Sequence, residues 1–322
     1  MGYPGFWEVW VGQTNVVVTG SLAFDHIMNL PGNFGDYILP DKIHTLNVSF
    51  LVDTLRKEFG GTGGNIAYNL VLLGIEVELV AAIGSDGDEY ISWLAKNKVA
   101  IDKVKKFGDV LTAAGFVITD RQDNQIWNFY GGAMREAHKL QITNSKFQKK
   151  PKLVIIAPND PEAMIAYAKE CQKNHWDYLF DPAFYIPTLG KKDLAMAVNR
   201  ARIIIGNDYE MTLLARKISD FRSQMAGNQI QITTLGERGS VIRQGDEEWR
   251  IPAAKARKVV DPTGAGDAYR AGFVAGYLQG LALKVCGRMG AVCAIYTVER
   301  YGTQTHKFSQ KEFKQRYAAN FR

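Results

Sequence analysis

The sequence predicts an α/β protein with a mostly parallel central β-sheet. Short apolar segments alternate along the chain with segments of helical periodicity, and this alternation is typical of βαβ units. With 46% hydrophobic and 22% charged residues, the composition is that of a globular protein. A length of 322 residues allows one large α/β domain or two ordinary ones.

Six apolar segments are expected to form strands of this sheet, at 15–21, 77–84, 152–158, 177–182, 202–207 and 230–236. Six other segments have the apolar spacing of amphipathic helices, at 63–73, 86–98, 160–173, 207–217, 264–279 and 284–297. In an open parallel sheet, functional side chains lie just beyond the carboxyl ends of the strands. The polar residues that follow these strands are therefore the first candidates for a site.

Two stretches, 27–58 and 110–133, interrupt the alternation. The first contains proline and glycine residues followed by HTLNVSFLVDTL, and the second has two β-rich runs, LTAAGFVITD and NQIWNFYGG, around a polar turn. Inserted strands that cannot join a buried parallel sheet are expected to form a small separate layer, a lid over the strand ends. The chain from 15 to 322 is expected to be one domain with these insertions, and 1–14 to be an N-terminal extension.

Charge and cysteine content exclude several classes of function. The formal net charge is +6 and the isoelectric point about 9.0, but the basic residues are scattered as on ordinary solvated faces, so no nucleic-acid partner is expected. Cys171, Cys286 and Cys293 have no paired spacing, which fits reduced thiols and a cytoplasmic location. No apolar run approaches the roughly 18 residues that span a bilayer, so no membrane partner is expected.

The segment DPTGAGDAYRAGF, 261–273, carries the clearest chemistry. A glycine-rich turn that opens a helix offers unpaired N–H groups and the positive end of the helix dipole to an anion such as phosphate. Asp267 would repel that phosphate unless it faces a second, neutral reactant whose proton it accepts. The motif therefore predicts a kinase-like arrangement, with Asp267 as the base and the glycine amides holding the developing charge.

Two further segments offer candidates for binding the second reactant. The segment EFGGTGGNIAYNLVLLG, 58–74, places four glycines before a helix, and Asn65 there offers a donor and an acceptor to hydroxyl groups. A tight strand-to-helix turn is the alternative explanation. Asp25 can accept hydrogen bonds from two adjacent hydroxyls, although a turn-stabilising role would also explain it.

Two further segments fit a nucleotide and its metal ion. Asn207 and Glu210 have the spacing of a capping box, and beside a phosphate loop the same carboxylate could hold a hydrated Mg²⁺. The segment TTLGERGSVI, 233–242, is either an ordinary hairpin or a turn that passes the phosphates and ribose of ATP. GxxxxGK[ST] and HExxH do not occur, which excludes a P-loop and gives no support to a metal held by the protein alone.

The motifs GG..GN, N..E, TLG.RG and D.TGAGD, in this order, resemble those of the ribokinase-like, or PfkB, family of carbohydrate and nucleoside kinases. The resemblance extends from about Asn15 to the end of the chain. Within the family, VTGSLAFDHIMNLPG, LNVSFLVDTL and DPTGAGDAYRAGF are most similar to bacterial adenosine kinases of the mycobacterial type and to archaeal nucleoside kinases. The resemblance implies an αβα sandwich with a β-sheet lid, and MgATP as the phosphoryl donor.

The resemblance also implies roles for individual residues. Asp267 would be the base, and the amides of Gly264, Ala265 and Gly266 would form the anion hole. The acceptor would be bound by Ser21, Asp25, Ser49, Gly60, Gly61 and Asn65, with Phe129 of the second lid segment stacked on its base. ATP would be bound by Asn207, Thr234, Gly236 and Gly239, and Mg²⁺ by Glu210 through water. Activation by K⁺, held by backbone carbonyls near 261–266 and 297–303, is compatible with the resemblance, but no residue pattern indicates it.

The function predicted from these motifs is ATP-dependent phosphorylation of the 5′-hydroxyl of adenosine, which gives AMP. Another nucleoside kinase, or a sugar kinase of the ribokinase or fructokinase type, is the alternative, because the lid and not the phosphate loop separates these enzymes. A catalytically idle nucleotide-binding regulator is disfavoured, since it has no need for a base in that loop. The expected partners are adenosine and ATP, and a homodimer formed through the lid is also compatible with the sequence.

Overall fold

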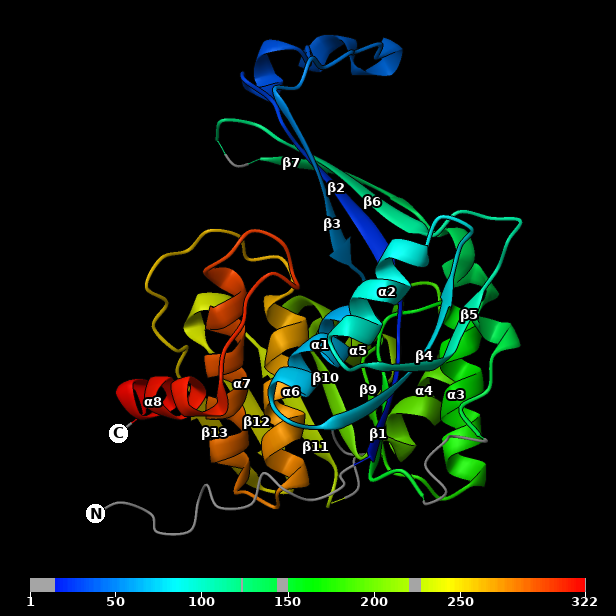
Figure 1. Cartoon of the computed structure of the whole chain (residues 1–322), viewed down its shortest axis with the longest axis vertical. Helices are drawn as coiled ribbons and strands as arrows, with labels where there is room; N and C mark the ends of the chain where they lie inside the picture. Colours follow the sequence, from blue (N-terminus) through cyan, green and yellow to red (C-terminus); the bar gives the residue numbers. More distant parts are fainter. Residues whose placement is uncertain (1–14, 123, 144–149, 220–226, 322) are drawn as a thin grey trace.

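The fold is described by a computed structural model, which defines residues 15–122, 124–143, 150–219 and 227–321. The expected extension, 1–14, lies outside these residues. Within them, the larger of two sheets has nine strands in the order β13-β12-β11-β10-β9-β8-β1-β4-β5 (Figure 1). Their bounds are β1 Asn15–Thr19, β4 Glu76–Ile83, β5 Ala100–Lys106, β8 Leu153–Ile156, β9 Tyr178–Phe180, β10 Ile203–Asn207, β11 Ile230–Thr234, β12 Ser240–Gln244 and β13 Glu247–Ile251.

The strands from β11 to β5 run parallel, and β12 and β13 complete one edge as an antiparallel hairpin. The continuous apolar run of β1 reflects burial on both faces. Val16 and Val18 pack into one core and Val17 into the other, as expected when successive side chains of a strand point to opposite faces. The predicted mostly parallel sheet is confirmed.

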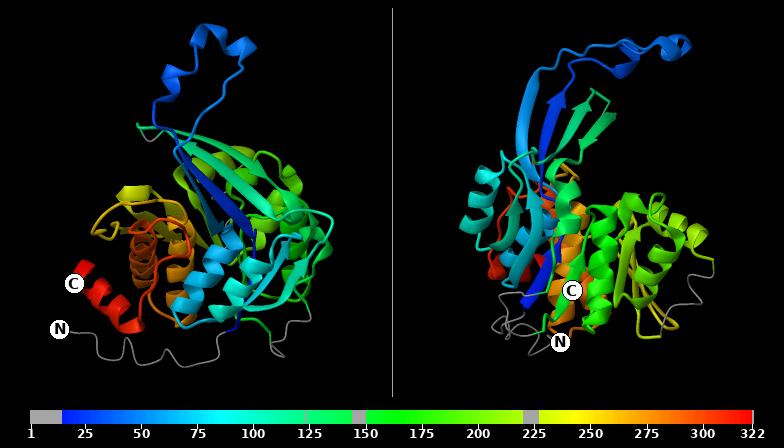
Figure 2. Two further views of the ribbon diagram at one scale, coloured as in Figure 1. Left: turned by 45° about the horizontal axis from the view of Figure 1, so that its top comes forward. Right: turned by 90° about the vertical axis from the view of Figure 1, so that its right-hand side faces the viewer.

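Helices cover both faces of this sheet (Figures 1 and 2). One core contains side chains of α1, α6 and α7, and the other contains side chains of α3, α4 and α5, which gives the three layers of the αβα sandwich. The helices are α1 Thr62–Leu72, α2 Asp88–Lys96, α3 Pro161–Lys173, α4 Lys191–Arg200, α5 Asp208–Lys217, α6 Ala265–Leu278, α7 Leu283–Val298 and α8 Gln310–Asn320, with short 3-10 helices η3 Gly132–Lys139, η4 Ala183–Tyr185 and η5 Gly236–Arg238.

A second sheet of four strands stands above the carboxyl ends of the parallel strands (Figure 1). Its order is β3-β2-β6-β7, with β2 Ala23–Asn29, β3 Thr54–Gly60, β6 Ala113–Thr119 and β7 Gln125–Tyr130. β2 begins before the expected boundary at 27, because β1 continues into the small sheet after only a short connection. The segment 30–53, with η1 Phe34–Asp36 and η2 Pro40–Thr45, projects beyond the small sheet.

Several elements have too little apolar patterning to be predicted. In α8 the buried apolar side chains are Phe313 and Tyr317, so most of its residues are polar and the apolar spacing of a helix is weak. The helix begins instead with a reciprocal capping box between Ser309 and Glu312. The edge strand β5, AIDKVKK, consists mostly of lysine and aspartate, and α4 and β13 are similarly short or polar.

The described part of the chain contains no helix that is long and apolar enough to cross a membrane. Cys171, Cys286 and Cys293 are buried thiols outside any disulfide. Their burial matches their use as small apolar residues in the two cores.

Candidate active site

The motif 261–273 forms the start of α6 at the carboxyl ends of the central strands. Gly264 precedes the helix and has φ +75°, a left-handed conformation that favours glycine. A Cβ at this position would also lie 2.8 Å from Cγ2 of Thr303. The turn therefore needs glycine at 264 for both its backbone conformation and its packing.

The N–H groups of this turn are not all available to a ligand. The first bond of the helix runs from the Ala268 N–H to the Gly264 carbonyl, 3.0 Å, so the N–H groups of Gly266 and Asp267 precede the helical ladder. The Ala265 N–H donates to the Pro262 carbonyl at 3.2 Å. Ala265, predicted to contribute to the anion hole, thus uses its N–H within the turn, and Gly266 and Asp267 are left to receive an anion.

Asp267 is the third residue of α6, and α1 holds its carboxylate. Asn65 Nδ2 donates to Asp267 Oδ2 at 2.9 Å. Burial raises the pKa of Asp267 to about 6, against the opposing effects of the Arg270 guanidinium and the Asn65 hydrogen bond. A carboxylate with this pKa is ionised at neutral pH and is a stronger base than an ordinary aspartate.

Asp25 occupies a space that two glycines leave open at the base of the small sheet. A Cβ on Gly60 would come within 2.0 Å of Asp25 Oδ2, and a Cβ on Gly115 within 2.9 Å of Oδ1. Burial, followed by the negative charges of Asp261 and Asp267, raises the pKa of Asp25 to about 7. Hydroxyl groups that donate to Asp25 would stabilise its charged form, so the space suits a ligand with adjacent hydroxyls.

Ser21 and Gly61 connect β1 with the start of α1. Gly61 has φ +83°, and a Cβ there would lie 2.5 Å from the Ser21 carbonyl oxygen. The Ser21 hydroxyl accepts a hydrogen bond from the Thr62 N–H at 3.1 Å, and its carbonyl accepts one from the Gly63 N–H at 3.0 Å. The structure therefore brings both residues to the Asp25 region but uses the Ser21 hydroxyl to cap α1.

Three carboxylates interact with the buried guanidinium of Arg270. Its Nε lies 2.6 Å from Asp181 Oδ2, and its charge lowers the pKa values of Asp267 and Glu210 while burial raises both. Three carboxylates and one guanidinium leave an excess of negative charge that a bound cation would balance. Asp181 was not among the predicted site residues. Its signal was its place directly after β9, at the carboxyl edge of the sheet.

Asn207 and Glu210 form a reciprocal capping box at the start of α5. Asn207 Oδ1 accepts the Glu210 N–H at 2.8 Å, and Glu210 Oε2 accepts the Asn207 N–H at 2.8 Å. Thr234 is paired with Asn207 across the parallel strands β10 and β11, so two of the segments predicted to bind ATP meet at this edge. The helix-capping role is confirmed, and a role of Glu210 toward Mg²⁺ stays a prediction.

The two glycines of the β11–β12 turn differ in what constrains them. Gly239 has φ +90°, and a Cβ there would lie 2.0 Å from the Ile251 carbonyl oxygen, so packing against β13 requires glycine. Gly236 has φ +62°, and its Cβ position faces no atom of the described residues within 4 Å. Of the two, Gly236 is the position that leaves space for a ligand.

The structure places Ser49 and Phe129 in different settings. Ser49 is exposed and belongs to the projecting segment 30–53 (Figure 1), so the structure does not bring it to Asp25 and Asp267. Phe129 is paired with Gly115, which is paired with Asp25. Because directly paired residues share a face of a sheet, Phe129 lies on the Asp25 face.

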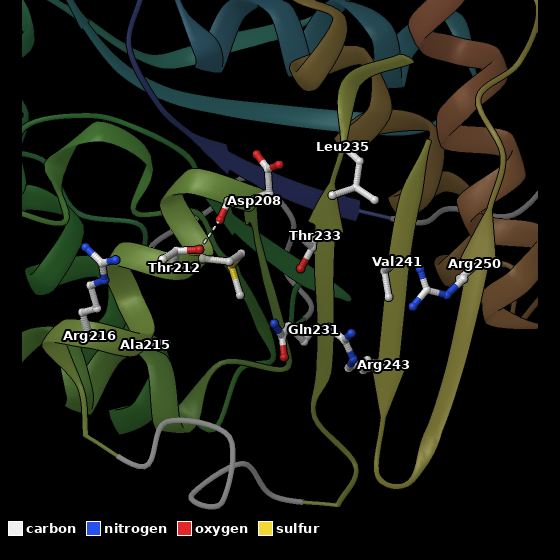
Figure 3. A pocket seen from close by; sticks show the side chains of 11 residues that line it. Asp208, Thr212, Ala215, Arg216, Gln231, Thr233, Leu235, Val241, Arg243 and Arg250 are labelled. Atoms are coloured by element: carbon white, nitrogen blue, oxygen red, sulfur yellow. Dashed lines mark hydrogen bonds between the residues drawn. The ribbon is translucent and has the colours of Figure 1, made fainter. Parts of the chain in front are cut away.

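A groove of about 650 Å³ lies between α5 and strands β11 to β13 (Figure 3). Gln231 and Thr233 of β11 line it, with Arg243 of β12. The intervening residue, Ile232, packs into the core that contains α6 and α7. The groove therefore opens on the opposite face of β11 from α6, and the residues that line it include none of the predicted site residues.

Comparison with known proteins agrees with this geometry. A family model described as pfkB family carbohydrate kinase matches residues 13–310. The nucleoside kinase of Methanocaldococcus jannaschii is 32% identical over 297 residues, which cover 90% of this chain and 92% of that protein. The structure of Burkholderia thailandensis nucleoside kinase in complex with inosine has a TM-score of 0.85 and 32% identity, and the match covers 95% of this chain and 98% of that one. The same kinase in complex with ADP-inosine has a TM-score of 0.83 and 33% identity, over 95% of this chain and 96% of that one.

The family model spans more than half of the chain, and both sheets have counterparts in the fold of these kinases. The αβα sandwich with a small second sheet is thus the ribokinase-like fold, as predicted. The chain is a phosphotransferase that acts on a hydroxyl group, and it belongs to the pfkB family of carbohydrate kinases.

Proposed function

We propose that the protein transfers the γ-phosphoryl group of ATP to the 5′-hydroxyl of adenosine. The observation that carries the proposal is the placement of Asp267, which is hydrogen-bonded to Asn65 and lies in the first turn of α6 beside the N–H group of Gly266. The similarity to two nucleoside kinases, one of them with a structure in complex with the purine nucleoside inosine, supports a nucleoside as the acceptor.

The surroundings of Asp25 support the ribose part of this proposal. Its buried carboxylate, with glycine at 60 and 115, would accept hydrogen bonds from the 2′- and 3′-hydroxyls. The charge of Asp267 contributes to the raised pKa of Asp25, and in the proposed complex the two carboxylates contact opposite ends of one ribose. The 5′-hydroxyl would then face Asp267.

In the proposed reaction, Asp267 accepts the proton of the 5′-hydroxyl while the oxygen attacks the γ-phosphorus in line. The N–H groups of Gly266 and Asp267, with the dipole of α6, stabilise the negative charge of the transferred group. Asn65 keeps the carboxylate oriented through its 2.9 Å hydrogen bond. Bound Mg²⁺ would neutralise phosphate charge, and the excess of carboxylates around Arg270 fits a cation that Glu210 holds through water.

The test is ADP formation with a panel of acceptors that contains adenosine, inosine, cytidine, ribose and fructose. We expect adenosine to give the highest kcat/KM. A higher value with inosine would move the proposal to a different purine nucleoside, since inosine is the compound bound to the Burkholderia kinase. A sugar as the best acceptor would overturn it.

The pH dependence of kcat/KM is expected to have an acid limb between about pH 7 and pH 6. Burial raises the pKa of Asp25 to about 7 and that of Asp267 to about 6. Both carboxylates act in their ionised form, so activity is present above these values and is lost as the pH falls through them. Initial rates at subsaturating adenosine measure this. A flat profile down to pH 5 would contradict the assignment of both residues.

Glu210→Gln is expected to raise the Mg²⁺ concentration needed for half-maximal activity. The matched control is Glu312→Gln, because Glu312 forms the same capping box with Ser309 in α8. Both variants should lose only tenths of a kcal/mol to about 1 kcal/mol of stability, because glutamine also serves at this position of a capping box, but only Glu210→Gln should change the Mg²⁺ titration. Equal titrations for the two variants would leave Glu210 with its helix-capping role alone.

We also propose a homodimer formed through the small sheet and its projecting segment. The side chains of Leu39, Ile43, Leu46, Leu51 and Leu55 are more than half exposed, and exposed apolar side chains concentrated in one segment are a candidate contact site. Sedimentation velocity should give about twice the monomer mass, and Leu51→Glu combined with Ile43→Glu should shift it to the monomer. A monomeric parent protein at all concentrations would contradict this proposal.

A further inference from the structure

A buried hydrogen-bond network connects Asp267 with the point where β3 leaves the small sheet. It starts at the side-chain amide of Asn65, which donates to Asp267 through Nδ2. The Oδ1 of the same amide accepts from Thr303 Oγ1 at 2.6 Å and from Gln304 Nε2 at 3.0 Å. Donors on one side and an acceptor on the other fix the orientation of the Asn65 amide.

Gln304 is the branching point of this network. Its Nε2 donates to Asn65 Oδ1 and also lies 2.5 Å from Tyr90 Oη, while its Oε1 accepts from Trp93 Nε1 at 3.1 Å. Gln304 and Tyr90 are buried. A Cβ on Gly64 would lie 2.0 Å from Tyr90 Oη and 3.0 Å from Gln304 Nε2, so the approach of Gln304 to Asn65 depends on the absence of a side chain at 64.

The far end of the network is the last residue of β3. The Tyr90 hydroxyl donates to the Gly60 carbonyl at 2.6 Å, and the Thr303 hydroxyl also lies 2.8 Å from the Phe59 carbonyl oxygen. Gly60 is the residue whose missing Cβ makes room for Asp25. The backbone that packs against Asp25 on one side is therefore bonded through Tyr90 and Gln304 to the amide that orients Asp267.

We propose that Gln304 is a positioning residue for phosphoryl transfer. Through Asn65 it holds Asp267 in a fixed position relative to the end of β3, which packs against Asp25. The inference rests on the proposed function, because it assigns Asp25 to the acceptor and Asp267 to its hydroxyl. A misplacement of about 1 Å between reacting groups can lower a rate by about 10²-fold. The network spans the two carboxylates whose separation must match the acceptor.

The test is Gln304→Met, which keeps the length of the side chain and removes its hydrogen bonds. We expect kcat to fall by about 10- to 100-fold, with the Kd of ATP from calorimetry unchanged within threefold. The control is Gln229→Met. Gln229 is also buried, and its Nε2 donates to the carbonyls of Val198 and Ala201 at 2.7 Å each, but it lies at the opposite end of β11 from the site.

A double variant shows whether Gln304 acts through Asp267. In an Asp267→Asn background, Gln304→Met should have little further effect on the residual rate, because the group that it positions is already lost. If Gln304→Met does not fold, Tyr90→Phe removes the hydroxyl that joins Gln304 to Gly60 and should lower kcat with little effect on ATP binding. An active parent protein with kcat unchanged in both variants would overturn the inference. A parent protein that phosphorylates no nucleoside would instead overturn the proposed function.

Discussion

Replacing Asp267 by asparagine is expected to lower kcat by about 10²- to 10⁴-fold, the usual effect of removing a general base. The amide is nearly isosteric with the carboxylate, and its oxygen can still accept the hydrogen bond from Asn65 Nδ2. It cannot accept the proton of the attacking hydroxyl. ADP formation with adenosine measures kcat, while calorimetry with ATP and a melting curve should show that nucleotide binding and the fold are retained.

The matched control for this variant is Asp193→Asn. Asp193 is the third residue of α4, as Asp267 is of α6, and so both carboxylates interact with a helix N-terminus. Asp193 is half exposed and pairs with Lys169 at 3.2 Å, outside the candidate site. The control should keep the parent kcat. Turnover of Asp267→Asn within threefold of the parent would remove Asp267 from the role of base.

The parts of the site that could be predicted are those whose functional groups all lie within one short segment of the sequence. The turn 261–267 contains its own glycine with positive φ, its helix start and its carboxylate, so the local sequence is enough. The same holds for Asn207 and Glu210, whose capping box spans four consecutive residues. In such segments the residue spacing directly determines the geometry.

The parts that could not be predicted depend on contacts between distant segments. Gln304 contacts Asn65 across 239 positions and Tyr90 across 214, and no periodicity or motif indicates such a pairing. Arg270 is a charged residue in an otherwise apolar helical segment, but its partner Asp181 became evident only from the tertiary fold, which brings the end of β9 to α6. Long-range pairing of polar groups follows from the tertiary fold and leaves little local signal.

The small sheet shows a second limit of sequence patterns. Aromatic residues in both inserted segments predict a surface for a base, but strand alternation alone does not say which face meets the site. In the structure these aromatic residues lie in different places. Phe50 packs against Phe34 and Tyr37 within the projecting segment, and Phe116 stacks on His26 at 4.7 Å. Trp127 and Phe129 lie on the other face, where the Trp127 ring approaches Gly115 beside Asp25.

Adenosine is expected to be preferred over ribose by about two orders of magnitude or more in kcat/KM. Trp127 and Phe129 are 46% and 50% exposed on the Asp25 face, which is more aromatic surface than a polar sugar needs. Stacking of a base on an aromatic side chain contributes about 1 to 3 kcal/mol, or about 10- to 100-fold. Closure of the small sheet over a base would add to this preference. Initial rates with the two acceptors measure it.

Phe129→Ala separates stacking on the base from a general effect on the small sheet. It should raise the KM for adenosine by about 10-fold or more and leave slow phosphorylation of ribose nearly unchanged, because ribose has no base to stack. The control is Phe116→Ala, which removes a ring of similar exposure, 39%, from the opposite face of the same sheet. It should leave both acceptors nearly unaffected. Equal losses with adenosine and ribose in Phe129→Ala would mean that the ring supports the sheet and does not contact the base. Ribose as the faster acceptor of the parent protein would make the protein a sugar kinase, because the aromatic face would then have no base to bind.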